Sequence, residues 1–388
     1  MRIWHTSDWH VGRTFHGHST LAALEEVLAA MAETVAELRA DVVVVAGDVY
    51  DSSTPSAEAI AVFNRALRRL HETGARLVIS SGNHDSPTRL GTMAEFIAAA
   101  GIHLLTRPER IEAPVTLDDA HGPVHFYGIP FLEPARLRHL WRSESPMRTQ
   151  ADAVGEAMRR IRADLAVRGG RSVVLAHTFV AGAEGESCES ERAIVDTDSV
   201  GGVDRVPLSA FDGVDYAALG HIHGRSTLAE HLRYSGAPLH LSFSEEAKPR
   251  GGWLVDLDAG GLAEVTWHDL PVLRRLVTLT GTLDDLLSDP AHTDAEDAWV
   301  RARLTDPQRQ REAMRRLQHR FPHCAQIEYV SLAATGTQGR AYRELVRGKS
   351  DAQIVDTFLQ TVRGAGLSEA ERELIDEVLA GGEQAGTA

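Results

Sequence analysis

The sequence predicts an α/β protein with a largely parallel core sheet, followed by a small α+β domain and a pair of C-terminal helices. Two observations predict the first part. Short apolar runs alternate with apolar residues at helical spacing, and most of these runs end at a polar loop. Strands and helices that alternate at this pace are typical of βαβ units. With 388 residues, the chain is long enough for one large domain and one or two small ones.

The first strand is expected at residues 2–5, and Asp8-x-His10 follows it directly. Side chains two residues apart in extended backbone point the same way, so Asp8 and His10 can reach one ion from one loop. Apolar residues three and four positions apart between Leu21 and Leu38 then predict a helix of about five turns.

The second strand is predicted by four consecutive valines, Val42 to Val45, and ends at Gly47-Asp48. Open α/β sheets carry their chemistry at such strand ends, which makes Asp48 a candidate site residue. Thr54-Pro55 is expected to supply the N-cap and first-turn proline of the next helix, and Gly74 to end it.

Three further expected strands lead into residues with metal-binding side chains. These strands and the residues after them are Leu77-Val78-Ile79 before Asn83-His84-Asp85, Val173-Val174-Leu175 before His177, and Tyr216-Ala217-Ala218-Leu219 before Gly220-His221-Ile222-His223. A strand around 124–128 and a helix at 151–168 are expected between them.

The pattern changes after residue 270. Expected strands at 277–279, 299–304 and 327–332, with a helix at 309–321, indicate a small α+β domain, and capping boxes at Ser350 and Ser368 open two tail helices. The predicted organisation is a first domain at 1–270, a capping domain at 271–335, a helical partner-binding segment at 340–380 and a disordered tail at 381–388. The apolar faces of the tail helices fit packing either on the chain's own body or on a partner.

The overall composition limits how the protein can contact nucleic acid, which cysteine chemistry it can use and where in the cell it is expected. The net charge is −15, so any contact with nucleic acid has to use a local basic or metal-charged patch, or a partner. Two cysteines, Cys188 and Cys324, are too few for a disulfide framework or a thiolate zinc cluster. The start of the sequence, Met1 to His5, lacks the apolar core expected of a signal peptide, and no apolar run is long enough to span a membrane, so a cytoplasmic protein is expected.

Each polar motif is weak when it is taken singly. Asp-x-His on a loop is more often a surface feature, Gly-Asp is a common turn dipeptide, and a histidine after a strand is usually a hydrogen-bonded core or rim residue. The five motifs together, in this order and each after an apolar run, predict a centre for two metal ions. The ligand types are carboxylate, amide and imidazole without thiolate, which suits Mn, Fe or Zn.

At these motifs the chain resembles the calcineurin-like metallophosphoesterases, whose fold is a β-sandwich flanked by helices. The resemblance implies that Asp48 bridges two metal ions and that His84 is the catalytic histidine. It implies Asp51 as the acid that orients His84, although some relatives carry a histidine there. It favours manganese, with one ion completed by Asp8, His10 and His223 and the other by Asn83, His177 and His221.

Neighbouring residues, including Tyr234-Ser235-Gly236-Ala237-Pro238, resemble those of a branch of the family that cuts DNA. The resemblance covers roughly residues 1–270. It implies a nuclease for double-stranded ends, hairpins and single strands that acts with a partner ATPase in recombination, replication and repair, as a homodimer within a larger complex. Beyond residue 270, the chain resembles this branch only in the layout of its domains and shares no specific motif with it.

Two other functions remain open from the sequence. The first is a phosphoesterase for a small nucleotide or a phosphoprotein with the same metals, although a small substrate needs neither the extra domain nor the tail. The second is an adaptor for an ATPase without catalysis of its own. The full set of ligands together with His84 disfavours an adaptor.

Overall fold

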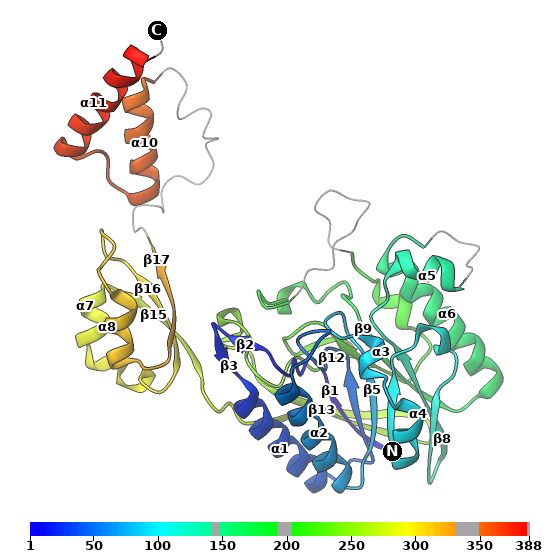
Figure 1. Ribbon diagram of the computed structural model, residues 1–388. Coiled ribbons are helices and arrows are strands. Elements are labelled where there is room, and N and C mark those ends of the chain that lie inside the picture. Colours follow the sequence, from blue (N-terminus) through cyan, green and yellow to red (C-terminus); the bar gives the residue numbers. More distant parts are fainter. Residues whose placement is uncertain (142–146, 192–203, 331–348, 386–388) are drawn as a thin grey trace. The chain divides into compact units, whose positions relative to one another are not determined.

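The computed structural model describes residues 1–141, 147–191, 204–330 and 349–385, and the chain divides into two compact units, Met1–Leu273 and Arg274–Ala388 (Figure 1). A Gly/Thr-rich linker, expected from the sequence at residues 335–339, lies outside the described residues. Among the described helices, none combines the length and apolar character needed to cross a membrane.

The first unit contains two six-stranded sheets. In the first sheet four strands run parallel, namely β1 (Arg2–Thr6), β4 (Val42–Ala46), β5 (Arg76–Ser80) and β6 (Ile102–Leu105). Two antiparallel strands, β13 (Gly251–Asp258) and β14 (Gly261–Asp269), extend this sheet beyond β1. Trp4 lies opposite Val43 on one side and Leu254 on the other, which fixes the register of β1.

The second sheet also has a parallel centre. Its strands, in order across the sheet, are β11 (Ser226–Ala229), β12 (Leu232–Tyr234), β10 (Tyr216–Gly220), β9 (Arg171–His177), β8 (Gly122–Ile129) and β7 (Val115–Asp119). Only β11 and β7, at the two edges, pair antiparallel with their neighbours. Parallel strands place their carboxyl ends at one edge of a sheet, so the loops after β9 and β10 lie together.

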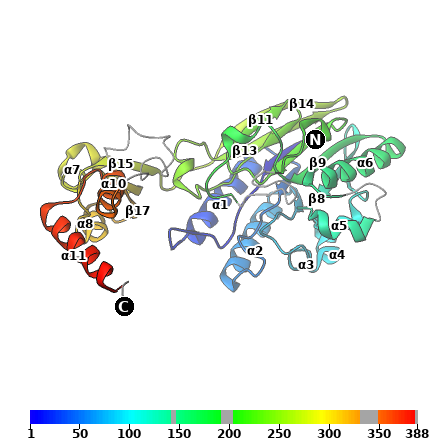
Figure 2. The ribbon, with the colours of Figure 1, turned by 90° about the horizontal axis from the view of Figure 1, so that it is seen from above.

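The two sheets pack face to face, and helices cover their outer faces. Val42 and Val44 enter the core between the sheets, whereas Val43 and Val45 enter the core beneath the helices. Both faces of β4 are therefore buried, which explains a continuous valine run rather than an alternating pattern. The first sheet is covered by α1 (Leu21–Glu37) and α2 (Ala57–Glu72), and the second by α5 (Pro134–Trp141) and α6 (Gln150–Arg168), as Figure 2 also shows. This is the predicted sandwich flanked by helices.

The start of α2 corrects a prediction. The helix begins at Ala57, and its N-cap is Ser56, whose hydroxyl accepts a hydrogen bond from the Ala59 amide. Thr54-Pro55 therefore precedes the helix instead of opening it. Both positions offer a suitable cap, and Ser56 is the one that places Ala59, Val62, Phe63, Ala66 and Leu70 toward the core.

The smaller elements of the first unit are a hairpin and short helices. The hairpin pairs β2 (Thr14–Phe15) with β3 (His18–Ser19). Two short α-helices, α3 (Pro87–Leu90) and α4 (Ala94–Ile97), follow β5. The 3₁₀ turns of the unit are η1 (Ala98–Ala100), η2 (Pro108–Arg110), η3 (Glu184–Glu186), η4 (Leu208–Phe211) and η5 (Phe243–Glu245).

The second unit begins with a parallel three-stranded sheet in the order β15 (Leu276–Gly281), β16 (Trp299–Leu304) and β17 (Cys324–Tyr329). Its core includes side chains from α7 (Leu283–Ser288), a helix that was not predicted, and from α8 (Ala313–Arg320); η6 spans Pro290–Ala295. The last strand begins three residues earlier than the expected 327–332. Pro322 cannot continue a helix, so α8 ends at Arg320 and the chain enters the sheet at Cys324.

Two tail helices, α10 (Asp351–Arg363) and α11 (Glu369–Ala385), form a hairpin. Ser350 and Gln353 form the predicted capping box of α10, and Ser368 and Glu371 form that of α11. The Asp356 carboxylate accepts a hydrogen bond from the Leu367 amide at 2.6 Å and so ties α10 to the turn. Because α11 continues to Ala385, disorder from residue 381 was a wrong prediction up to that residue; residues 386–388 lie outside the described part.

Candidate metal centre

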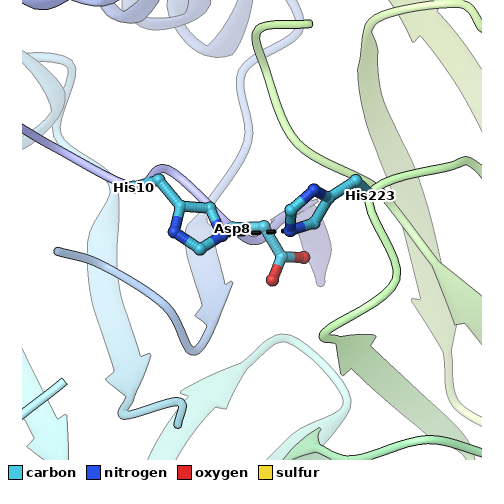
Figure 3. Close-up of side chains that lie close together, drawn as sticks. All are labelled: Asp8, His10 and His223. Carbon is cyan, nitrogen blue, oxygen red and sulfur yellow. Dashed lines mark hydrogen bonds between the residues drawn. The ribbon is translucent and has the colours of Figure 1, made fainter. Parts of the chain in front are cut away.

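The predicted ligands come together where strands of both sheets end. Asp8 and His10 follow β1, Asp48 follows β4, and Asn83 follows β5. The second sheet contributes His177 at the end of β9, and His221 and His223 after β10. Three groups have candidate ligand atoms within 4.8 Å of one another: Asp8, His10 and His223; Asp8, Asp48 and His177; and His10, Asp48 and His84. Figure 3 shows the first group.

Four predicted ligands have backbone in the left-handed region. The φ angles are 53° at Asp8, 44° at His10, 46° at Asp48 and 108° at His221. They are four of the eight non-glycine residues with positive φ in the described part of the chain. Such conformations are costly for residues with a Cβ atom, and they cluster at functional sites.

Hydrogen bonds between loops hold this backbone. The Asp8 amide donates to the Gly47 carbonyl at 3.1 Å, and the His10 amide donates to the Asp48 carbonyl at 3.0 Å. The His84 amide donates to Asp48 Oδ1 at 2.9 Å, and the His221 amide to Asp8 Oδ1 at 3.0 Å. The loops of the two sheets therefore fix one another.

Two motif glycines are required by close packing. Gly47 has a φ of 82°, and a Cβ atom there would lie 2.4 Å from His177 Nδ1. A Cβ atom at Gly220 would lie 1.8 Å from the Ala46 carbonyl oxygen. The glycines of the Gly-Asp and Gly-His motifs thus let His177 and its neighbours approach the β4 loop.

The His177 ring is held so that Nε2 faces oxygen atoms. Its Nδ1 donates to the Ala46 carbonyl at 3.0 Å, because a carbonyl only accepts. Its Nε2 lies 2.9 Å from Asn83 Oδ1 and 3.4 Å from Asp48 Oδ2. If the His177 ring is neutral, its Nε2 atom is an acceptor and faces two further acceptors, Asn83 Oδ1 and Asp48 Oδ2. A cation or a proton between these three atoms would stabilise the arrangement. Burial favours the neutral ring, but the Asp48 and Asp8 carboxylates outweigh it and raise the pKa of His177 to about 9.

The rings of His10 and His223 also bring two nitrogen atoms close together. Their Nε2 atoms lie 3.0 Å apart, and Figure 3 shows Asp8 beside both rings. On the outer side, His223 Nδ1 lies 2.6 Å from Ser190 Oγ. The His221 ring lies 5.4 Å, between centroids, from the His177 ring, and its side chain is in none of the three close groups.

The buried carboxylates also fit a divalent cation. Burial raises the pKa of Asp8 to about 8, and the Asp48 charge adds to the effect. Burial also favours a higher pKa for Asp48, but the neighbouring histidines His177, His10 and His84 outweigh it and hold the pKa of Asp48 well below the ordinary value. For both carboxylates to be ionised so close together in the interior, positive charge is needed nearby. The donor set of buried carboxylates and imidazoles can therefore hold divalent metal ions.

The predicted pairing of His84 with Asp51 takes an unexpected form. His84 Nδ1 lies 2.9 Å from the Asp51 main-chain oxygen and 3.6 Å from its carboxylate. Asp51 Oδ1 accepts a hydrogen bond from Arg13 at 3.0 Å and approaches His10 Nδ1 at 3.2 Å. The nearest Asp51 oxygen to His84 is therefore the carbonyl.

Asp85 holds two loops together through hydrogen bonds to their main chains. Its carboxylate accepts hydrogen bonds from the amides of Val49 at 3.0 Å, Tyr50 at 2.8 Å and Gly82 at 2.9 Å. Burial, followed by repulsion from Asp48, raises the pKa of Asp85 to about 7. The side chain thus ties the loop after β4 to the loop after β5.

Sequence reasoning missed the residues that contact the predicted ligands from outside. Ser190, Glu245 and Arg250 lie behind His223, and Ser7 and Ser235 lie behind Asp8. Ser235 belongs to a motif that carries the resemblance, but nothing in the sequence indicates its contact. Ser190 and Glu245 are separated by 55 residues and follow no ligand spacing.

Comparison with known proteins agrees with the two-part organisation. The family model described as calcineurin-like phosphoesterase matches residues 1–225, which is more than half of the chain. A second model, described as type 5 capsule protein repressor C-terminal domain, matches residues 272–363. The SbcD component of the SbcCD nuclease of Staphylococcus epidermidis is 24% identical over 381 residues, which are 98% of each chain.

Two solved structures resemble the chain distantly. TT1561 of Thermus thermophilus is 15% identical, with a TM-score of 0.40, over 69% of this chain and 98% of its own. A dimetal phosphatase from Danio rerio is 12% identical, with a TM-score of 0.40, over 70% of this chain and 99% of its own.

Proposed function

Since the chain belongs to the calcineurin-like phosphoesterase family and, within it, to the SbcD type of nuclease component, we propose that it cleaves DNA in a metal-dependent reaction together with an SbcC ATPase. The proposed activities are exonuclease action on double-stranded ends and endonuclease action on hairpins and single strands. They would serve recombination, replication and repair in the cytoplasm. The convergence of buried carboxylates and histidines at the strand ends is the observation that carries this proposal.

The proposed ligands divide between two ions. Asp48 is the bridge; Asp8, His10 and His223 complete one ion, and Asn83, His177 and His221 complete the other. The close group of Asp8, His10 and His223 supports the first set. When bound, two divalent ions supply an activated water and neutralise the charge of a phosphodiester. The proposed metal is manganese.

His84 is the proposed proton donor to the leaving oxygen. Its Nδ1–H group donates to the Asp51 carbonyl, so the proton available for transfer is on Nε2 of the charged ring. His84 Nε2 lies 4.0 Å from Asp48 Oδ2, on the side of the predicted ligands. Asp51 contributes by orienting this ring through its main chain.

The α10–α11 hairpin is the proposed binding site for SbcC. Three large apolar side chains on it are exposed: Phe358 at 48%, Leu374 at 59% and Val378 at 62%. Leu374 and Val378 are four residues apart and share one face of α11. Amphipathic helices commonly present such apolar faces to partner proteins. A homodimer within a heterotetramer with SbcC is the proposed assembly.

The deciding experiment is digestion of a linear duplex and of a hairpin by the purified protein. It compares manganese with magnesium, with and without SbcC and ATP, beside the variant His84→Ala. Manganese-dependent cleavage that is lost in His84→Ala is the expected result. Absence of cleavage from protein with confirmed bound metal, together with hydrolysis of cyclic nucleotides, would support a small-substrate phosphoesterase. A protein that purifies without stoichiometric metal would instead support a non-catalytic adaptor.

A further inference from the structure

The Ser190 hydroxyl lies between the predicted ligand His223 and the carboxylate of Glu245. Ser190 Oγ is 2.6 Å from His223 Nδ1 and 2.5 Å from Glu245 Oε1. An ionised carboxylate only accepts, so the hydroxyl donates to Glu245 and accepts from the Nδ1–H group of His223. This places the ring proton of His223 on Nδ1 and leaves the lone pair on Nε2, the atom 3.0 Å from His10 Nε2.

Glu245 is held so that it does not reach His223 directly. Its side chain is fully buried, and its other oxygen, Oε2, lies 3.0 Å from Arg250 Nη2 and accepts from the Leu241 amide at 3.0 Å. Glu245 Oε1 is 3.8 Å from His223 Nδ1, beyond hydrogen-bond distance. The hydroxyl of Ser190 spans this gap.

The backbone around Ser190 is anchored independently of its hydroxyl. The Ser190 carbonyl accepts a hydrogen bond from Arg13 Nη2 at 3.0 Å. The next residue, Glu191, accepts one from the His223 amide at 2.8 Å. Removing only the hydroxyl therefore leaves these contacts in place, and its effect can be separated from loss of the loop.

We propose that Ser190 is a positioning residue of the metal centre, whose hydroxyl connects Glu245 to His223 and fixes the tautomer and the direction of the His223 ring. The inference rests on the proposed function, because it assumes that His223 binds a metal ion. Hydrogen bonds from outside a metal centre orient histidine ligands, and their removal typically lowers metal affinity about 10- to 100-fold. Activity at saturating metal should change much less, because Ser190 is not assigned to the reacting atoms.

The test is calorimetric titration of Mn²⁺ into metal-stripped full-length protein. It compares the wild type with Ser190→Ala, Ser190→Thr and Ser244→Ala. Ser244 is the matched control, because its hydroxyl contacts the Glu189 amide at 3.1 Å and Ser242 Oγ at 2.6 Å on the same side of the site. Nuclease assays over a range of Mn²⁺ concentrations and thermal unfolding of the metal-stripped proteins accompany the titration.

The expected result is a Mn²⁺ affinity about 10- to 100-fold weaker in Ser190→Ala, near wild-type in Ser190→Thr and unchanged in Ser244→Ala. The Mn²⁺ concentration for half-maximal cleavage should rise, whereas kcat at saturating Mn²⁺ stays within a few-fold of the wild type. Wild-type affinity in Ser190→Ala, or a loss fully explained by a lower melting temperature, would overturn the inference alone. Failure of the wild type to bind Mn²⁺ would overturn the proposed function and this inference with it.

Discussion

His84 contacts Asp51 through the main chain: His84 Nδ1 lies 2.9 Å from the Asp51 carbonyl oxygen, whereas the Asp51 carboxylate is 3.6 Å away. Substitution of Asp51 therefore removes a side chain that faces Arg13 and His10 but keeps the oxygen that orients His84. The two residues can be separated by mutation, although the sequence predicts them as a pair.

His84→Ala is expected to lower kcat about 10²- to 10⁴-fold, since it removes the proposed proton donor. Asp51→Ala should lower kcat by less than about tenfold, because the carbonyl remains and only the contacts to Arg13 and His10 are lost. Single-turnover cleavage at saturating Mn²⁺ measures both. An equal loss in the two variants would show that the carboxylate, rather than the carbonyl, supports His84.

Gly220→Ala is expected to destabilise the first unit and to weaken metal binding. Its Cβ atom would lie 1.8 Å from the Ala46 carbonyl oxygen and 3.0 Å from His177 Nδ1, so backbone has to move. Overpacking of this kind costs about 1–3 kcal/mol.

The matched control for Gly220→Ala is Gly155→Ala in the interior of α6, where no atom beyond the neighbouring residues and the helix's own backbone lies within 4 Å of the added Cβ. This substitution should be neutral or stabilising by about 0.5–1 kcal/mol, because alanine favours a helix over glycine. Urea unfolding of both variants gives the comparison. Similar stability changes in the two variants would contradict the packing argument for Gly220.

The buried His5 ring predicts a pH dependence of stability. Its Nδ1 lies 2.9 Å from the Tyr216 hydroxyl and its Nε2 3.2 Å from the Leu219 carbonyl oxygen. Burial is the largest cause that lowers the pKa of His5 to about 3 in the folded protein, against an ordinary value of 6.5. Below about pH 6.5, His5 binds a proton in the unfolded chain but stays neutral in the folded chain. The contribution of His5 to stability is therefore lost as the pH falls.

Between about pH 7 and about pH 5 this contribution amounts to roughly 2 kcal/mol in the free energy of unfolding. His5→Gln removes the titrating group, so its stability should depend less steeply on pH over this interval. Urea unfolding of both proteins at several pH values measures the difference, and the other histidines cancel in the comparison. Parallel pH profiles for the two proteins would exclude His5 as a source of the dependence.

Leu374→Asp and Phe358→Asp are each expected to weaken binding to SbcC at least about tenfold, because apolar anchors at the centre of an interface carry much of its binding energy. Glu377→Gln, a change at an exposed position on the same helix α11, should bind normally. Binding to immobilised SbcC, with nuclease assays on single strands as a control for folding, provides the measurement. Normal binding by both aspartate variants would place the contact elsewhere.

The sequence predicts the strands that lead to the proposed ligands because each is a short apolar run that stops at a polar loop. Val42 to Val45 form a strand buried on both faces, and Asp48 follows it at the site. Contacts across the fold are less predictable. Ser190 connects Glu245 to His223 through two hydrogen bonds, and no residue spacing in the sequence indicates these contacts. The beginning of α2 was missed because Thr54 and Ser56 are equally good caps in sequence, and packing selects the second.

The division of the proposed ligands between the two sheets has a consequence for assembly of the fold. Asp8, His10, Asp48 and Asn83 belong to loops of one sheet, whereas His177, His221 and His223 belong to the other. A metal ion held by both groups would act as a cross-link across the sandwich, and half a sandwich would offer an incomplete set of donors. Manganese uptake during refolding is therefore expected only after the two sheets have docked, and uptake before docking would show that one sheet alone suffices.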